Sequence, residues 1–155
     1  MEINWQRAAA YVVLVDDLDR ILLTKFELQG HGLSGSWTLP GGGMEWGEQA
    51  IETATRELFE ETGLSADIGP LIGTTSEWIE AENSLRGQSG HSIKLLFTAS
   101  NPTGELKRDF SDDDTTVDAA WFPLNEVRTL RRVPVVDIAF DLVTKSKQHS
   151  AQIDI

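Results

Sequence analysis

Short runs of apolar residues, interrupted by polar turns, predict β-strands along most of the chain. Residues 7–15 and 21–26 are rich in aliphatic side chains, and the polar segment 16–20 between them has the composition of a turn. Two such runs joined by a short turn indicate a β-hairpin. Further extended segments are predicted over residues 37–39, 68–79 (broken), 92–99 and 117–122.

Other segments have helical composition. Residues 48–62 contain many Glu, Ala and Leu but no Gly or Pro, and Gly63 stands where helices commonly end. Residues 135–144 repeat apolar side chains at helical spacing, and residues 123–130 are predicted to form a short helix opened by proline. The polar residues that follow are expected to fray. Strands with helices before and after them predict one α+β domain of packed layers over residues 1–155.

Composition and charge narrow the classes of function. The chain has no cysteine, which excludes disulfides, thiolate metal sites and a cysteine nucleophile, and fits a cytoplasmic protein. The N-terminus lacks the layout of a signal peptide, and the longest apolar run, residues 8–15, is too short to cross a membrane. A net charge of −12 argues against binding to nucleic acid duplexes. An anionic small substrate is compatible with this charge only if a cation mediates.

Three glutamates gather at the end of the helical segment 48–62. At about 100° per residue, Glu57, Glu60 and Glu61 share one face, and Glu61 projects into the edge of the apolar stripe. A solvated acidic face is the ordinary explanation for such a pattern. Here, however, like charges repel at this spacing, and the last turn of a helix disfavours anions. A partly buried carboxylate also needs a partner, and Arg56 alone cannot neutralise all three.

A bound divalent cation removes these objections together. Carboxylate oxygens, completed by water and substrate phosphates, are the ligands of Mg²⁺, with Mn²⁺ as an alternative. A metal would also connect an acidic protein to an anionic substrate.

The residues around these glutamates resemble the signature of the Nudix (MutT-like) hydrolase superfamily. The matching pattern is Gly42, five residues, Glu48, seven residues, and then Arg56-Glu57-Leu58-Phe59-Glu60-Glu61-Thr62-Gly63-Leu64. The resemblance implies the Nudix fold, an α/β/α sandwich with a mixed β-sheet. It also implies a Mg²⁺-dependent hydrolase that cleaves a diphosphate bond. The implied substrate is a nucleoside triphosphate or a nucleoside diphosphate linked to another moiety.

The same resemblance implies roles for individual residues. Glu57, Glu60 and Glu61 would hold the metal, with the Gly41 carbonyl as a further ligand. Glu57 would also be the general base, so that the implied catalytic residues are Glu57, Arg56 and Glu61. Arg56 would orient a carboxylate through charge-assisted hydrogen bonds. The supporting residues would be Gly42 and Glu48, at the junction of loop and helix.

One expected acidic residue has no clear match. Family members often supply a further carboxylate from a loop shortly before the position matched by Trp121, and that place falls near Thr115. Either a nearby aspartate substitutes, or Glu57 acts alone. The candidates are Asp112, Asp113, Asp114 and Asp118.

Several questions stay open at this level. The sequence does not define the substrate, the number of metals or the phosphorus that is attacked, and a homodimer is expected only from the family's habits. Two other functions are possible alternatives. One is a non-catalytic Nudix-like nucleotide-binding module. The other is an isomerase of isoprenoid diphosphates, whose known examples use a cysteine that this chain lacks. Candidate phosphate contacts, chosen on charge and nearby strands, are Arg7, Lys25, Arg86 and Lys94.

Overall fold

The computed structural model describes residues 4–84 and 86–153, with side chains up to residue 146. Its strands form two sheets. The larger sheet has the order β4-β1-β6-β5 and the smaller sheet the order β3-β2-β7. The strands are β1 (Trp5–Leu14), β2 (Arg20–Phe26), β3 (Ser36–Thr38), β4 (Gly41–Gly43), β5 (Ser65–Ile79), β6 (Gly90–Thr103) and β7 (Thr116–Pro123). Strands β1 and β6 run parallel and the other pairs antiparallel, so the larger sheet is mixed.

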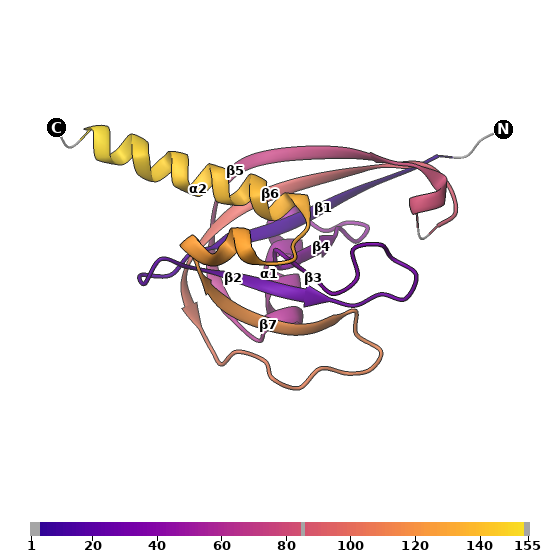
Figure 1. The fold of residues 1–155 in the computed structure, drawn as a ribbon, viewed down its shortest axis with the longest axis horizontal. Coiled ribbons are helices and arrows are strands. Elements are labelled where there is room, and N and C mark those ends of the chain that lie inside the picture. The colour runs from indigo at the N-terminus through magenta and orange to yellow at the C-terminus, as the bar shows by residue number, and fades with distance from the viewer. Residues whose placement is uncertain (1–3, 85, 154–155) are drawn as a thin grey trace.

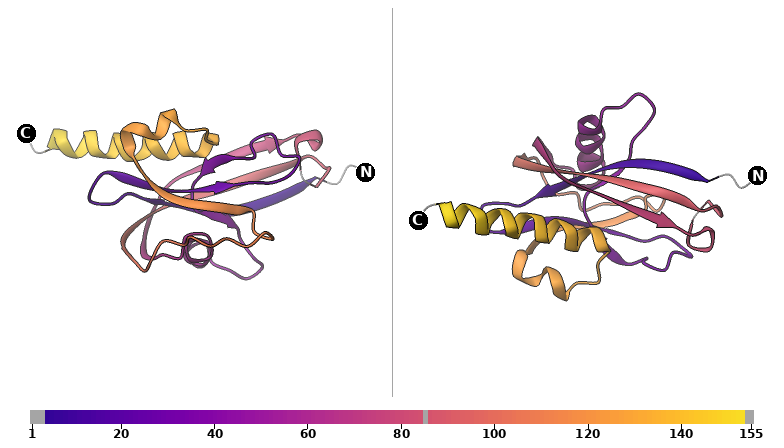
Figure 2. Two further views of the ribbon diagram at one scale, coloured as in Figure 1. Left: turned by 60° about the horizontal axis from the view of Figure 1, so that its bottom comes forward. Right: turned by 90° about the horizontal axis from the view of Figure 1, so that it is seen from above.

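Helices cover the sheets from opposite sides. Helix α1 (Ala50–Thr62) lies below the strands and α2 (Pro134–Ile153) above them in the left view of Figure 2. The structure also contains two short 3₁₀ helices, η1 (Ala81–Asn83) and η2 (Leu124–Thr129). Figure 1 shows α2 lying across the strands of the larger sheet. This arrangement confirms the predicted α+β class with a mixed sheet.

Two apolar clusters hold the layers together. On the α1 side, Ala54 and Leu58 pack with Val12 and Leu14, all essentially buried. On the α2 side, Val136 and Ala139 pack with residues of β1, β2 and β6. Each fully buried Leu or Val contributes about 1.5–3 kcal/mol. Helix α1 is therefore fixed along one stripe, and the carboxylates beside that stripe are held near the strands.

The predicted hairpin of residues 7–15 and 21–26 is wrong. Strands β1 and β2 belong to different sheets, and a single bridge between Val15 and Ile21 connects them. The reason is that β4 and β6 occupy both edges of β1, so β2 finds no free edge there. The turn itself is ordered, because the Asp16 carboxylate accepts hydrogen bonds from the backbone N–H groups of Leu18 (3.0 Å) and Arg20 (2.9 Å).

Helix α2 is longer than the predicted segment 135–144, since it begins at Pro134 and continues to Ile153. Residues 145–153 contain no Gly or Pro, so nothing in their backbone stops the helix. Strand β5 is longer than expected, although its register shifts three times between Ser65 and Gly73, where a broken segment was predicted. Within the described residues, no helix is long and apolar enough to span a membrane.

Candidate metal and diphosphate site

The ends of α1 are fixed by local hydrogen bonds. At the start, the Glu52 carboxylate accepts a bond from the Gln49 backbone N–H (2.7 Å). At the end, Gly63 adopts a left-handed conformation (φ 76°), and its N–H donates to the Phe59 carbonyl (2.9 Å). A side chain at Gly63 would also approach the Glu105 carbonyl to 2.7 Å. The last turn, which carries Glu60 and Glu61, is thus held in one place.

Arg56 is the centre of a network of carboxylates. Its guanidinium makes two parallel bonds to Glu48 (2.8 and 2.9 Å). The same group donates to Glu57 (3.0 Å) and Glu60 (3.2 Å), and to the Gly43 carbonyl (3.3 Å). Such a fork fixes orientation as well as charge. The structure therefore brings Arg56 together with Glu48, Glu57 and Glu60, as the sequence pattern suggested.

The fork shifts the acidity of Glu48. Hydrogen bonds from Arg56, and then from the Glu45 backbone N–H, lower the pKa of Glu48 to about 2. The Thr53 hydroxyl also donates to Glu48 (2.9 Å). The pKa of Arg56 is raised by the same contacts. Glu48 thus stays ionised at neutral pH and ties the loop after β4 to the body of α1.

Glu61 lies in the opposite electrostatic situation. Burial, followed by the negative charge of Glu57, raises the pKa of Glu61 well above its ordinary value. Thr24 on β2 and the backbone of Gly41 act in the other direction. The Thr24 hydroxyl is buried, yet it meets no partner at full hydrogen-bond geometry. A crowded carboxylate beside an unsatisfied oxygen is a place where a cation would be stabilised.

The glycines of β4 make room for this arrangement. A side chain at Gly42 would come within 2.6 Å of the Glu57 carboxylate. Gly41 has a φ of 150°, and a side chain there would collide with the Ala10 carbonyl. Only glycine lets the backbone and the α1 carboxylates approach so closely. The Gly41 carbonyl, the predicted further ligand, lies in this corner.

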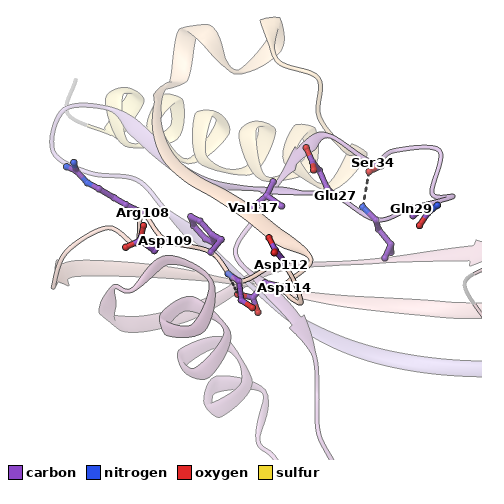
Figure 3. A pocket seen from close by; sticks show the side chains of 11 residues that line it. Glu27, Gln29, Ser34, Arg108, Asp109, Asp112, Asp114 and Val117 are labelled. Carbon is purple, nitrogen blue, oxygen red and sulfur yellow. Dashed lines mark hydrogen bonds between the residues drawn. The ribbon is translucent and has the colours of Figure 1, made fainter.

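Asp114 is the one downstream aspartate that joins the glutamates. It lines a pocket of about 150 Å³ together with Glu57, Glu60 and Glu61. Asp112 and Asp114 also line a groove of about 770 Å³ between the loops that follow β2 and β6 (Figure 3). Asp118 lies instead on β7, opposite Lys25 of β2.

Lys107 is a member of the site that the sequence reading missed. Its ammonium donates to the Glu60 carbonyl (3.2 Å) and lies 3.6 Å from the Asp114 carboxylate. Its backbone N–H donates to the Thr62 carbonyl (2.8 Å). Lys107 therefore fastens the loop before β7 to the end of α1. No spacing rule points to a lysine in an irregular loop 47 residues away, so only its charge could have suggested it.

The oxygen donors suit a hard divalent cation such as Mg²⁺ or Mn²⁺. Within the described part of the chain, however, no three Asp, Glu or His side chains already surround one point. Glu60 is 56% exposed and turns toward Arg56. Glu57 and Glu61 are the better placed pair, because Glu57 crowds Glu61 and both lie near the β4 glycines.

The other candidate phosphate contacts are dispersed. Lys94 on β6 pairs with Glu77 of β5 (3.0 Å), and Arg86 lies over the ring of Trp5. Arg7 lies against Gly43, where a side chain would collide with its guanidinium. Trp46 is fully exposed, and Trp78 is 51% exposed.

The carboxylates of α1 meet the glycine corner of a mixed sheet in an α+β fold, and comparison with known proteins identifies the family. The family model of the NUDIX domain matches residues 5–140, so the chain belongs to the NUDIX family.

Solved structures agree with this assignment. A MutT NUDIX hydrolase from Burkholderia pseudomallei superposes with a TM-score of 0.73 at 26% identity, covering 90% of this chain and 99% of that one. A NUDIX hydrolase from Nitrosomonas europaea gives 0.70 at 24% identity, covering 92% and 91%.

Among curated relatives, the human 8-oxo-dGDP phosphatase NUDT18 is 28% identical over 96% of this chain and 43% of its own length. The ADP-ribose pyrophosphatase of Methanocaldococcus jannaschii is 32% identical over 79% of this chain and 66% of its own length. The putative mutator protein MutT4 of Mycobacterium tuberculosis is 34% identical over 59% of this chain and 34% of its own length. The chain thus spans between a third and two thirds of these relatives.

Proposed function

We propose that this protein is a metal-dependent hydrolase that cleaves a diphosphate bond in a nucleoside triphosphate or in a nucleoside diphosphate linked to another group. The observation that carries the proposal is the crowding of the buried Glu61 carboxyl by the Glu57 carboxylate beside the glycines of β4. Nudix hydrolases generally use a divalent metal and act on small nucleotide substrates. The names of the relatives, which include an 8-oxo-dGDP phosphatase and an ADP-ribose pyrophosphatase, support the same reaction type.

The residues of the site divide the work of hydrolysis. Glu57 and Glu61, with the Gly41 carbonyl, would hold Mg²⁺ or Mn²⁺, and Glu60 is a more exposed third candidate. The bound metal supplies charge neutralisation of the phosphates and a lowered pKa of water. Glu57 would take the proton of the attacking water while Arg56 holds its carboxylate in place. The water oxygen forms a bond to one phosphorus, and the bond to the bridging oxygen breaks as the other phosphate leaves.

Asp114 is the alternative proton acceptor, because it lines the same pocket as the glutamates. Glu48 would act indirectly, because its two hydrogen bonds from Arg56 orient the guanidinium that contacts Glu57. A cytoplasmic location and a homodimer remain predictions of the sequence.

A panel of nucleotides tests the proposal. The protein is incubated with Mg²⁺ and with ADP-ribose, 8-oxo-dGDP, nucleoside triphosphates and dinucleoside polyphosphates, and the released phosphate or nucleoside monophosphate is measured. We expect hydrolysis of at least one member, and a loss of about a hundredfold or more in Glu57→Gln. Binding of nucleotides without hydrolysis under Mg²⁺ or Mn²⁺ would instead establish the non-catalytic binding module.

A further inference from the structure

We propose that Arg7 binds the phosphate of the substrate that lies farther from the metal, and so determines how tightly diphosphate compounds bind. This inference rests on the proposed function. It concerns a residue outside the glutamate helix and outside the signature that the sequence shares with its family.

Arg7 lies next to the glycine corner of β4. Arg7, Ala9 and Tyr11 alternate along β1 and share one face of the larger sheet, since successive strand residues point to opposite faces. On the neighbouring strand, Gly43 pairs with Ala9 and Gly41 with Tyr11. A side chain at Gly43 would collide with the Arg7 guanidinium, so Arg7 occupies the space over the glycine corner.

Strand β4 connects the position of Arg7 with that of the carboxylates. The phenol of Tyr11 is largely buried, and its pKa is raised by that burial. The charge of Arg7 lowers this pKa, whereas Glu61 and Glu57 raise it. The packing around β4 points the same way, because a side chain at Gly42 would meet the Glu57 carboxylate and one at Gly43 would meet the Arg7 guanidinium. Since β4 is an edge strand, a diphosphate whose one phosphate lies at the carboxylate-bound metal can extend along β4 toward Arg7.

The balance of charges around the site also favours Arg7 as a phosphate ligand. The chain carries 25 acidic and 13 basic residues, and most cations near the site are already neutralised. Arg56 is engaged by carboxylates, and Lys94 is paired with Glu77. In the described part of the chain, no carboxylate forms an ion pair with Arg7, and this exposed side chain is open to a ligand. Its planar fork of donors matches two phosphate oxygens.

The surface of the larger sheet leads from Arg7 across β6 and β5 to a cleft that could hold the nucleoside part of the substrate. Glu77 lies on β5 opposite Ser92, which is itself opposite Arg7. Glu77 also lines a cleft of about 370 Å³ between the end of β5 and the loop that contains His31. A nucleoside attached to the phosphate at Arg7 would extend into this cleft, where the carboxylate of Glu77 can accept hydrogen bonds from base or sugar.

Binding of α,β-methylene-ADP, which cannot be hydrolysed at the bridging position, tests the role of Arg7 in the presence of Mg²⁺. By calorimetry, Arg7→Gln should weaken binding about ten- to a hundredfold, as expected for a charge-assisted contact. Arg7→Lys should recover part of the loss. The matched control is Arg128→Gln, which removes the same charge from an exposed side chain on η2 and should bind like the wild type.

A second variant approaches the same contact from the opposite side. In Gly43→Ala the new methyl group must displace the guanidinium, which is the flexible end of its side chain, so the fold should be kept. Gly43→Ala should weaken binding in the wild type, yet add nothing in the Arg7→Gln background. With whichever nucleotide is hydrolysed, Arg7→Gln should raise KM more than it lowers kcat.

The outcomes separate the two proposals. Unchanged affinity in Arg7→Gln, with Mn²⁺ binding and hydrolysis intact, overturns the role of Arg7 and leaves the hydrolase standing. Absence of nucleotide binding, Mn²⁺ binding and hydrolysis in the wild type overturns both. Equal loss of Mn²⁺ affinity and nucleotide affinity in Arg7→Gln also overturns the proposal, because Arg7 would then act on the metal site rather than on the distal phosphate.

Discussion

Glu61 illustrates how a single residue can be unfavourable for the fold and still suit the proposed metal site. Its carboxyl group is buried beside the carboxylate of Glu57, and its pKa is raised because burial and repulsion disfavour the charged form. A group with such a shift stabilises the folded protein most at low pH. This contribution is lost as the pH rises through the folded-state pKa. A cation reverses the situation by neutralising both carboxylates.

Replacement of Glu61 by Gln should therefore raise the melting temperature of the metal-free protein at neutral pH. Each kcal/mol gained corresponds to about 3 °C for a chain of this size. Activity should fall by about a hundredfold or more. Differential scanning fluorimetry with EDTA or with Mg²⁺ measures the effect. Mg²⁺ should stabilise the wild type but not the variant, and a variant that is less stable than the wild type in EDTA would contradict the account.

Glu48 should behave in the opposite way. Its pKa of about 2 lies below its ordinary value, so its stabilising contribution is present above the ordinary range and disappears as the pH falls toward 2. Glu48→Gln should lower the melting temperature at pH 7 and reduce activity by about ten- to a hundredfold, because Arg56 loses its two-bond partner. The exposed Glu126 on η2 offers a control, Glu126→Gln, whose melting temperature should stay unchanged.

At the scale of elements, the loop between β6 and β7 matters most for the site. Lys107 connects it to the end of α1 and faces Asp114, which lines the glutamate pocket. An exposed ion pair contributes little to stability by itself. Here, however, the ammonium of Lys107 also donates a hydrogen bond to a backbone carbonyl in the last turn of α1. The loop's position over the carboxylates therefore depends on Lys107.

Lys107→Met should release this loop. In the wild type, the backbone N–H of residue 107 donates to the Thr62 carbonyl. In the variant, we expect faster hydrogen exchange at this amide and a loss of activity of about tenfold. Lys107→Arg keeps the charge and should retain most of the protection. If the exchange rate in Lys107→Met equals that of the wild type, the loop is held by other contacts and the proposed fastening role is wrong.

Several elements could be predicted from local patterns, whereas their pairing could not. The apolar runs identified β1, β2 and β7, and helical composition located α1 to within two residues. Whether β1 pairs with β2 depends on β4 and β6, which come from distant parts of the chain. The shared face of the glutamates follows from helical spacing, and the role of Arg56 is implied by the resemblance to the Nudix signature. Neither pattern points to Lys107 or Thr24, because they approach α1 only through tertiary packing.

At the scale of the whole molecule, layers and charge act together. Helix α1 is packed on one side of the sheets and α2 on the other, so that the glutamate helix meets the glycine corner of β4 at a fixed angle (Figure 2). The protein as a whole is acidic, with a net charge of −12. Association with an anionic substrate should therefore depend on the bound cation and should show KM values that rise steeply when free Mg²⁺ is lowered.

The carboxylate site itself is tested most directly by anomalous diffraction from crystals soaked in MnCl₂. The account predicts an anomalous peak between Glu57 and Glu61, at about 2.0–2.2 Å from their oxygens and close to the Gly41 carbonyl. Crystals of Glu61→Gln should lack it. A wild-type map without any peak at these carboxylates would contradict the central claim that they are there to bind a divalent ion.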